Sequence, residues 1–206
     1  MRRLTIRLLL FCSTLLPASA VPILDFSGGV PFLFADQTRG WAFSLSSAVT
    51  VTSLGWFDVG SDGLLDAHPV GIWDGAGNLL LSATVQAGSA DPLVNGFRYN
   101  SALTGTPTLA AGSYVIGGRS GADDLVIFAT ATMLPAGTFL GTRTNSAASF
   151  SFPTTALPGQ DDGYFGPNFQ IAGVPEIDRR NATLPLALSL FALLTLVGRH
   201  SVALGR

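Results

Sequence analysis

The strongest constraint on the fold is a set of short segments in which apolar and polar residues alternate with a period of two. In the segment 79–85, Leu81, Ala83 and Val85 are apolar, and the residues between them are Ser and Thr. A period of two places alternate side chains on opposite faces of a strand, whereas a helical face repeats every 3.6 residues. No part of the segment 21–173 has the pattern of a long amphipathic helix. The pattern therefore predicts an all-β domain.

Nine short runs have this strand character, and clusters of turn-forming residues separate them. The runs are 41–45, 49–52, 70–73, 79–85, 97–101, 113–119, 125–133, 139–144 and 165–171. A typical separator is Asp74-Gly75-Ala76-Gly77-Asn78, which combines an Asx residue with two glycines. About nine short strands with frequent turns predict a β-sandwich of the jelly-roll or Greek-key type. A closed β-barrel is the alternative.

The first 20 residues have the three parts of a secretory signal peptide. Basic residues come first, the apolar run 8–16 follows, and Ala18 and Ala20 form an A-x-A cleavage site. We expect signal peptidase to cut after Ala20, so that the exported domain would be 21–173. The chain has a single cysteine, Cys12, and this cleavage would remove it. The mature chain would then have no disulfide and no thiol chemistry.

The other end contains an uncharged apolar stretch, 182–198. As a helix rising about 1.5 Å per residue, it would be roughly 25 Å long, which is at the short limit for crossing a bilayer. Arginines lie on both sides of it, and a basic C-terminal flank is typical of a cytoplasmic tail. We therefore expect a transmembrane helix with the domain outside the cell. A buried C-terminal helix of the domain is the alternative.

The residues before this stretch are Val174, Pro175, Glu176, Ile177 and Asp178. This motif, followed by an apolar span and arginine, resembles a PEP-CTERM sorting signal, in the variant with a V-P-E-I-D motif. The resemblance implies that a membrane sorting protease, an exosortase, reads the tail 174–206. It also implies transfer to, or release at, the cell surface in bacteria that make exopolysaccharide.

A second resemblance covers about residues 40–118. The residues that carry it are Gly40-Trp41-Ala42-Phe43, the run 51–58, Asp62-Gly63-Leu64, the run 68–74, the run 77–80, the run 96–99 and the run 109–117. Together they resemble an exported β-sandwich domain of unknown function that recurs in bacterial surface proteins with sorting tails. The resemblance implies a fold and carries no activity.

The charge of the domain excludes several classes of function. Within 21–173 there are four arginines and eleven aspartates, which give a formal net charge of −7. An acidic body repels phosphate backbones, so we expect no binding to nucleic acid. The chain has no lysine at all, which excludes Schiff-base chemistry and a P-loop lysine.

The segment 21–173 has few combinations of residues that could form a catalytic or metal site. His68 is the one histidine of 21–173, and the chain has no G-x-S-x-G motif that would mark a serine nucleophile. One imidazole is too few for a zinc site. The pairs Asp123-Asp124 and Asp161-Asp162 are expected on solvated loops, with their carboxylates pointing apart. We therefore expect a protein that is not an enzyme and that needs no cofactor.

Two weaker site hypotheses remain. Asp58, Asp62 and Asp66 are spaced four apart in a glycine-rich loop and could hold Ca²⁺. Pro69 stands where an EF-hand would have its bidentate Glu, so the loop is not an EF-hand. The other interpretation of this loop is a solvated turn in which the carboxylates cap backbone amides.

The three tryptophans allow two interpretations as well. Trp41, Trp56 and Trp73 could stack on sugar rings, as in carbohydrate-binding modules, or they could fill the core of the sandwich.

The sequence as a whole favours an exported, surface-sorted, non-enzymatic protein with a structural or adhesive role in the envelope or extracellular matrix. The alternative is a carbohydrate-binding module for exopolysaccharide.

Overall fold

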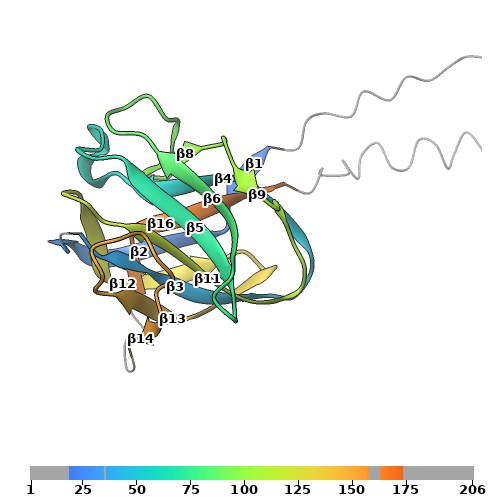
Figure 1. The fold of residues 1–206 in the computed structure, drawn as a ribbon. Helices are drawn as coiled ribbons and strands as arrows, with labels where there is room; N and C mark the ends of the chain where they lie inside the picture. Colours follow the sequence, from blue (N-terminus) through green and yellow to red (C-terminus); the bar gives the residue numbers. More distant parts are fainter. Residues whose placement is uncertain (1–18, 35, 158–162, 174–206) are drawn as a thin grey trace, which may run out of the picture. The chain divides into compact units, whose positions relative to one another are not determined.

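The computed structural model describes residues 19–34, 36–157 and 163–173 (Figure 1). These residues belong to one compact unit, Ser19–Gly173. Its secondary structure is β throughout, apart from the short 3-10 turn η1 (Val59–Ser61). Among the described residues, no helix has the length and apolar character needed to cross a bilayer. The predicted transmembrane stretch 182–198 lies outside the described residues.

Sixteen strands make up the unit, and many of them are short. They are β1 (Ala20–Pro22), β2 (Leu24–Leu33), β3 (Thr38–Leu45), β4 (Val49–Phe57), β5 (His68–Asp74), β6 (Leu79–Val85), β7 (Leu93–Val94), β8 (Phe97–Asn100), β9 (Thr104–Gly105), β10 (Thr108–Leu109), β11 (Gly112–Arg119), β12 (Asp124–Met133), β13 (Gly137–Asn145), β14 (Thr155–Ala156), β15 (Gly163–Phe165) and β16 (Pro167–Ala172).

The strands form three antiparallel sheets. A seven-stranded sheet has the order β14-β13-β3-β11-β5-β6-β9. A six-stranded sheet has the order β1-β16-β4-β8-β7, with β10 also paired to β4. The third sheet, β15-β12-β2, has three strands. Consecutive strands often belong to different sheets, as β3, β4 and β5 do, so most strand neighbours are distant in sequence. The prediction of a sandwich-like all-β fold is confirmed.

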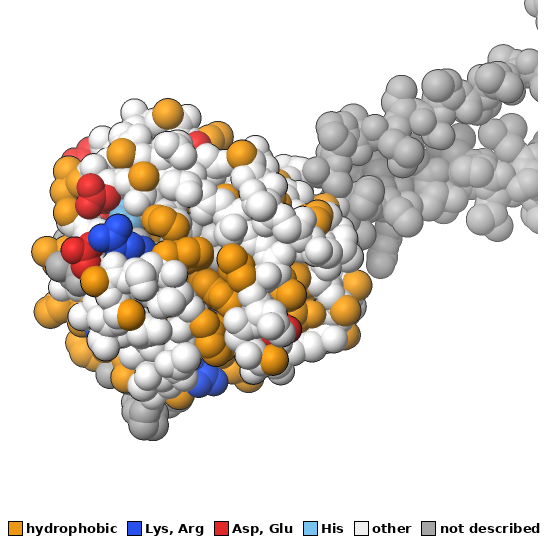
Figure 2. Space-filling model, viewed as in Figure 1, with side chains coloured by type: hydrophobic (Ala, Val, Ile, Leu, Met, Phe, Trp, Pro, Cys, Tyr) orange, Lys and Arg blue, Asp and Glu red, His pale blue; other side chains and the backbone are white. Residues whose placement is uncertain are grey.

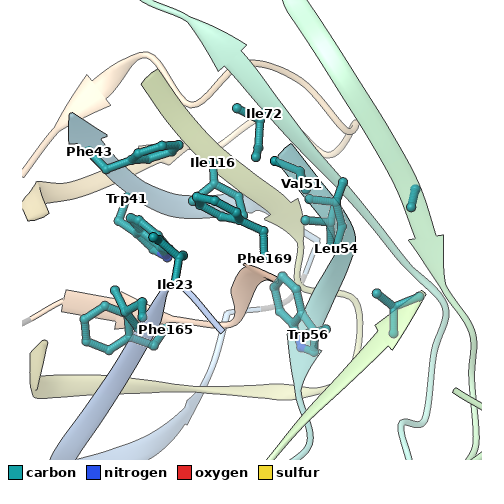
Figure 3. Close-up of a cluster of buried hydrophobic side chains, with 14 of the residues drawn as sticks. Ile23, Trp41, Phe43, Val51, Leu54, Trp56, Ile72, Ile116, Phe165 and Phe169 are labelled. Carbon is teal, nitrogen blue, oxygen red and sulfur yellow. The ribbon is translucent and has the colours of Figure 1, made fainter. Parts of the chain in front are cut away.

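The core lies between the two large sheets and is rich in aromatic rings (Figure 3). Trp41 and Phe43 of β3 pack against Phe169 of β16, with ring centroids 6.1 and 5.1 Å from that ring. The indole Nε1 of Trp41 donates a hydrogen bond to the carbonyl of Pro167 at 2.9 Å. This bond crosses from one sheet to the other, so the buried indole is satisfied while it joins the layers.

The three-stranded sheet adds a second aromatic group to this core. Phe26 of β2 stacks on Phe165 at 5.2 Å and meets Phe57 edge-on at 4.9 Å. Phe128 of β12 has a φ of 59° and lies at an irregularity in the pairing of β12 with β15. A positive φ is rare for a bulky residue, and it turns the Phe128 side chain outward, where it is 54% exposed.

The nine predicted runs all contain strands, and β6 has the predicted bounds 79–85. The predicted run 165–171 is instead divided at Gly166 into β15 and β16, which join different sheets. The ten-residue strand β2 was not among the predicted runs, and neither were five strands of two or three residues, β1, β7, β9, β10 and β14.

Candidate functional site

A buried ion pair holds the loops that follow β4 and precede β8. Arg98 Nε donates to Asp58 Oδ2 at 2.7 Å, and the two side chains are 6% and 1% exposed. The Nη1 group of Arg98 also donates to the carbonyls of Ser89 and Asp91, at 3.2 and 3.1 Å. The backbone N–H of Gly63 donates to the Asp58 carboxylate. Both charges are therefore neutralised inside the protein, and one guanidinium connects several loops.

A second buried cluster centres on His68, the first residue of β5. Its Nδ1 is 2.8 Å from the carbonyl of Arg119, and its Nε2 is 2.9 Å from Asp123 Oδ2. Because a carbonyl can only accept, Nδ1 donates to the carbonyl of Arg119. The backbone N–H groups of Leu65 and Asp66 donate to the same carboxylate, each at 2.9 Å.

This second cluster is closed to solvent. The indole ring of Trp56 stacks on the imidazole of His68 with centroids 4.4 Å apart and planes only 2° from parallel. His68 is fully buried, and Asp123 is 8% exposed. The expectation of a solvated loop for Asp123 was therefore wrong, because the carboxylate folds inward to accept from the N–H groups of Leu65 and Asp66 and to contact His68 Nε2. Both ring nitrogens of His68 are used for structure.

The three aspartates of the proposed calcium loop have different environments. Asp58 is buried in the ion pair with Arg98, whereas Asp62 is exposed. Asp66 is exposed and accepts a hydrogen bond from the N–H of Ala122 at 2.8 Å. In the part of the chain that the structure describes, no group of three or more His, Cys, Asp or Glu residues could hold a metal ion. Asp58 and Asp66 each accept from a backbone N–H, as in the capping interpretation, but Asp58 is buried rather than solvated.

The tryptophans are inside the protein. Trp41 and Trp56 have no exposed surface, and Trp73 is 4% exposed. Trp73 lies on the outer face of the seven-stranded sheet, where the rings of Phe150 and Phe152 cover it at 5.2 and 6.1 Å. Their faces are thus unavailable for stacking on a sugar, and this burial favours the core-packing interpretation.

Three ionisable groups elsewhere in the described residues, Arg39, Asp74 and Tyr99, have shifted pKa values. Burial lowers the pKa of Arg39, whose guanidinium carbon lies 3.9 Å above the centre of the Phe34 ring. Burial also raises the pKa of Tyr99 far above its usual value. The side-chain hydrogen bond from Asn78 lowers the pKa of Asp74, which anchors the β5–β6 turn. Each shift follows from packing or from a turn, and none marks a reactive group.

Residues 146–154, between β13 and β14, cross the outer face of the seven-stranded sheet, and we call them the strap. Thr38 of β3 donates to the carbonyl of Ser149 at 3.1 Å and accepts from the N–H of Ser151 at 3.2 Å. Phe150 lies directly over Gly71, where a Cβ atom would come within 2.9 Å of the ring. Figure 2 shows hydrophobic side chains as a band across the middle of this face.

A hollow of about 450 Å³ lies on one side of the strap, and we call it the β6 groove. Its lining residues carry hydroxyl, amide, small or apolar side chains, and none carries a charge. They are Pro69, Ser82, Ala83, Thr84, Gln86, Asn100, Ala102, Thr104 and Phe150.

Strand register places the groove hydroxyls on one face. Thr84 is paired with Pro69, and Ser82 is paired with Gly71 on one side and with Thr104 on the other. Directly paired residues share a face of a sheet, and the buried Leu81, Ala83 and Val85 occupy the opposite face. The hydroxyls of Ser82 and Thr84 therefore lie in one row along β6, with Thr104 beside Ser82 on one side and Gly71, covered by Phe150, on the other. The alternation within 79–85 could have indicated the polar row, but nothing in the sequence connects it with Phe150.

A second hollow, of about 360 Å³, lies against the other part of the strap. It is lined by Ala42, Gly75, Ser113, Tyr114, Val115, Leu140, Arg143, Phe152, Pro153 and Thr154. Unlike the β6 groove, it has a cationic side chain, that of Arg143, and an apolar floor from Ala42 and Val115. The strap thus lies between a hollow without a charged lining residue and a hollow that Arg143 lines.

The remaining predicted sites lie at or beyond the ends of the described residues. Ala20 of the signal-cleavage site is the first residue of β1, and Ala18 lies outside the described residues. The sorting motif Val174–Asp178 and the arginines after it also lie outside them.

Comparisons with protein-family models, with curated proteins and with solved structures found no match for this chain.

Proposed function

We propose that this protein is an exported, surface-sorted β-sandwich protein with a non-enzymatic, structural or adhesive role in the bacterial envelope or extracellular matrix. Signal peptidase would remove residues 1–20, and an exosortase-type protease would act at Val174–Asp178. The helix 182–198 would hold the chain in the membrane until then. The sequence patterns of the two ends support this route, together with the compact all-β unit between them.

One observation carries the non-enzymatic part of the proposal. Four buried side chains are of types that could act in catalysis, but they bond to one another or to backbone groups. They are His68, Asp123, Asp58 and Arg98. A general base or nucleophile must reach a substrate, and these groups face the interior. Their role is better explained as holding loops between strands.

The finer fold assignment is also a proposal. We infer a jelly-roll or Greek-key arrangement, because successive long strands repeatedly change sheet and hairpins between sequence neighbours are few. Such a sandwich presents broad sheet faces and edges, which are suited to contacts in a matrix.

The test is mass spectrometry of the mature protein made from the full chain in a bacterium that carries an exosortase. We expect termini at Val21 and near Pro175-Glu176. A Glu176→Ala variant should keep Arg206, because the sorting protease would no longer recognise the motif. The exposed-loop variant Asp62→Ala should be processed like the wild type. A wild-type protein that keeps Arg206 would contradict tail processing, and one that keeps Met1 would contradict export through the signal peptide.

A further inference from the structure

We propose that the β6 groove binds a neutral glycan, through the hydroxyls of Ser82, Thr84 and Thr104 and the ring of Phe150. This site is distinct from the buried tryptophans. It assigns a ligand to the exported domain, which goes beyond a structural role.

The first argument is that three hydroxyls of the groove make no hydrogen bond within the protein. In the part of the chain that the structure describes, the side-chain hydroxyls of Ser82, Thr84 and Thr104 make no hydrogen bond to the protein. By contrast, the buried hydroxyl of Ser53 donates to Gln170 Oε1 at 2.7 Å. Three hydroxyls on one face, each able to donate and accept, match the hydroxyls of a sugar chain lying across β6 and β9.

The second argument is charge. The domain carries eleven aspartates, yet none lines the groove. Asp91, which is half-buried, lies behind two wall residues: its carboxylate accepts from the Asn100 amide at 3.3 and 3.4 Å and from the Gln86 N–H at 2.7 Å. The walls at Asn100 and Gln86 are thereby held in place, and the groove surface stays uncharged. A neutral ligand would avoid the repulsion that the acidic body exerts on anions.

The third argument is the aromatic wall. Phe150 is half-buried, fixed from below by Trp73 at 5.2 Å and seated over Gly71. Its ring borders the hollow together with the ring of Pro69. An apolar wall beside a polar row suits a pyranose, which has C–H faces as well as hydroxyls. Sites that bind small molecules commonly combine such walls with a few convergent polar groups.

The test is titration calorimetry of the full chain, held in a detergent without a sugar headgroup. The probes are hexasaccharides of β-1,4-glucan, β-1,3-glucan and β-1,4-mannan, with a galacturonate hexasaccharide as the anionic comparison. We expect saturable binding of at least one neutral probe, and weaker binding of the galacturonate.

The variants locate the site. Thr84→Ala and Thr104→Ala should each weaken binding about fivefold, which corresponds to the loss of one hydrogen bond. Phe150→Leu should weaken it up to about tenfold while it keeps an apolar cover over Gly71. The matched control is Ser113→Ala, a hydroxyl deletion in the second hollow, which should leave binding unchanged. Circular dichroism of each variant reports whether the β-fold is retained.

Four outcomes would overturn the inference. The first is no saturable binding of any neutral probe at millimolar concentration. The second is tighter binding of the galacturonate than of every neutral probe. The third is a folded Thr84→Ala variant that binds as tightly as Ser113→Ala. The fourth is binding of an extended uncharged peptide without binding of any glycan. These readouts are independent of the termini found by mass spectrometry, so failure here and failure of the export proposal are distinguishable.

Discussion

The loops held by the Asp58–Arg98 and His68–Asp123 pairs, which we call the loop end, use polar residues in the opposite way to the outer face of the seven-stranded sheet. At the loop end, Asp58, Arg98, His68 and Asp123 are buried and satisfied by one another or by backbone groups. On the outer face, the hydroxyls of β6 and β9 lie in an open hollow without partners among the described residues. Polar groups that are paired inside the protein stabilise the fold, whereas unpaired groups at the surface are available to a ligand.

The largest expected effect comes from breaking the buried ion pair. Arg98→Ala leaves the Asp58 carboxylate charged and buried, so it should lower the free energy of unfolding by about 3–5 kcal/mol. The matched control is Arg119→Ala, which breaks an ion pair with Asp36 whose side chains are 39% and 56% exposed. That variant should lose less than about 1 kcal/mol. Urea unfolding measures both, and equal losses would contradict the comparison.

The next effect comes from the histidine cluster. Asp123→Ala removes the acceptor of His68 and of two backbone N–H groups, so it should lower the free energy of unfolding by about 2–3 kcal/mol. Asp62→Ala, on the exposed turn of the same end, should change it by less than about 0.5 kcal/mol. If the two variants unfold at the same urea concentration, the Asp123 contacts do not hold the loops.

A pH dependence should follow from Tyr99. Burial raises its pKa above the usual value of 10.0. The folded state therefore holds a proton that the unfolded state releases, and the stability due to neutral Tyr99 is complete below pH 10. Above that pH, the free energy of unfolding should decrease by about 1.4 kcal/mol per pH unit.

The control for this dependence is Tyr99→Phe. The hydroxyl of Tyr99 is buried without a hydrogen-bond partner among the described residues, so its removal should cost little at neutral pH. The variant should lose the steep decrease between pH 10 and pH 11.5, measured by urea unfolding at each pH. An unchanged slope in Tyr99→Phe would assign the decrease to another group.

The smallest effect belongs to the groove. The double variant Ser82→Ala/Thr84→Ala should change the free energy of unfolding by less than about 0.5 kcal/mol, because neither hydroxyl bonds to the protein. Ser53→Ala leaves Gln170 without its buried donor and should cost about 1–3 kcal/mol. A large loss in the groove variant would mean that its hydroxyls serve the fold.

The alternating runs were predictable because one buried face requires a period of two. In β6, Leu81, Ala83 and Val85 are buried as the alternation predicts. The strand β2 was not predicted, because Gly28, Gly29 and Pro31 interrupt the alternation of apolar and polar residues. Both glycines have a positive φ, and the strand is formed through its pairing with β12. Its propensity is low, and tertiary contacts override it.

The pairing of the polar residues could not be predicted from the sequence. The spacing of Asp58, Asp62 and Asp66 suggested a shared ligand, yet each carboxylate has its own environment. The Asp58 partner is 40 residues away, and the His68 partner is 55 residues away. No local pattern indicates which of eleven aspartates will be buried, because the choice depends on which strands become neighbours.

The sequence by itself determined that this chain forms strands, where most of them lie and which side of β6 is apolar, because those properties depend on neighbouring residues along one strand. Only the tertiary structure decided which aspartates meet Arg98 and His68, and that Phe150 lies beside Ser82 and Thr84. The order of strands in the sheets brings these residues together across long stretches of chain. Burial then makes the pairing of the charged groups necessary, since an unpaired buried charge costs more than the fold can offset.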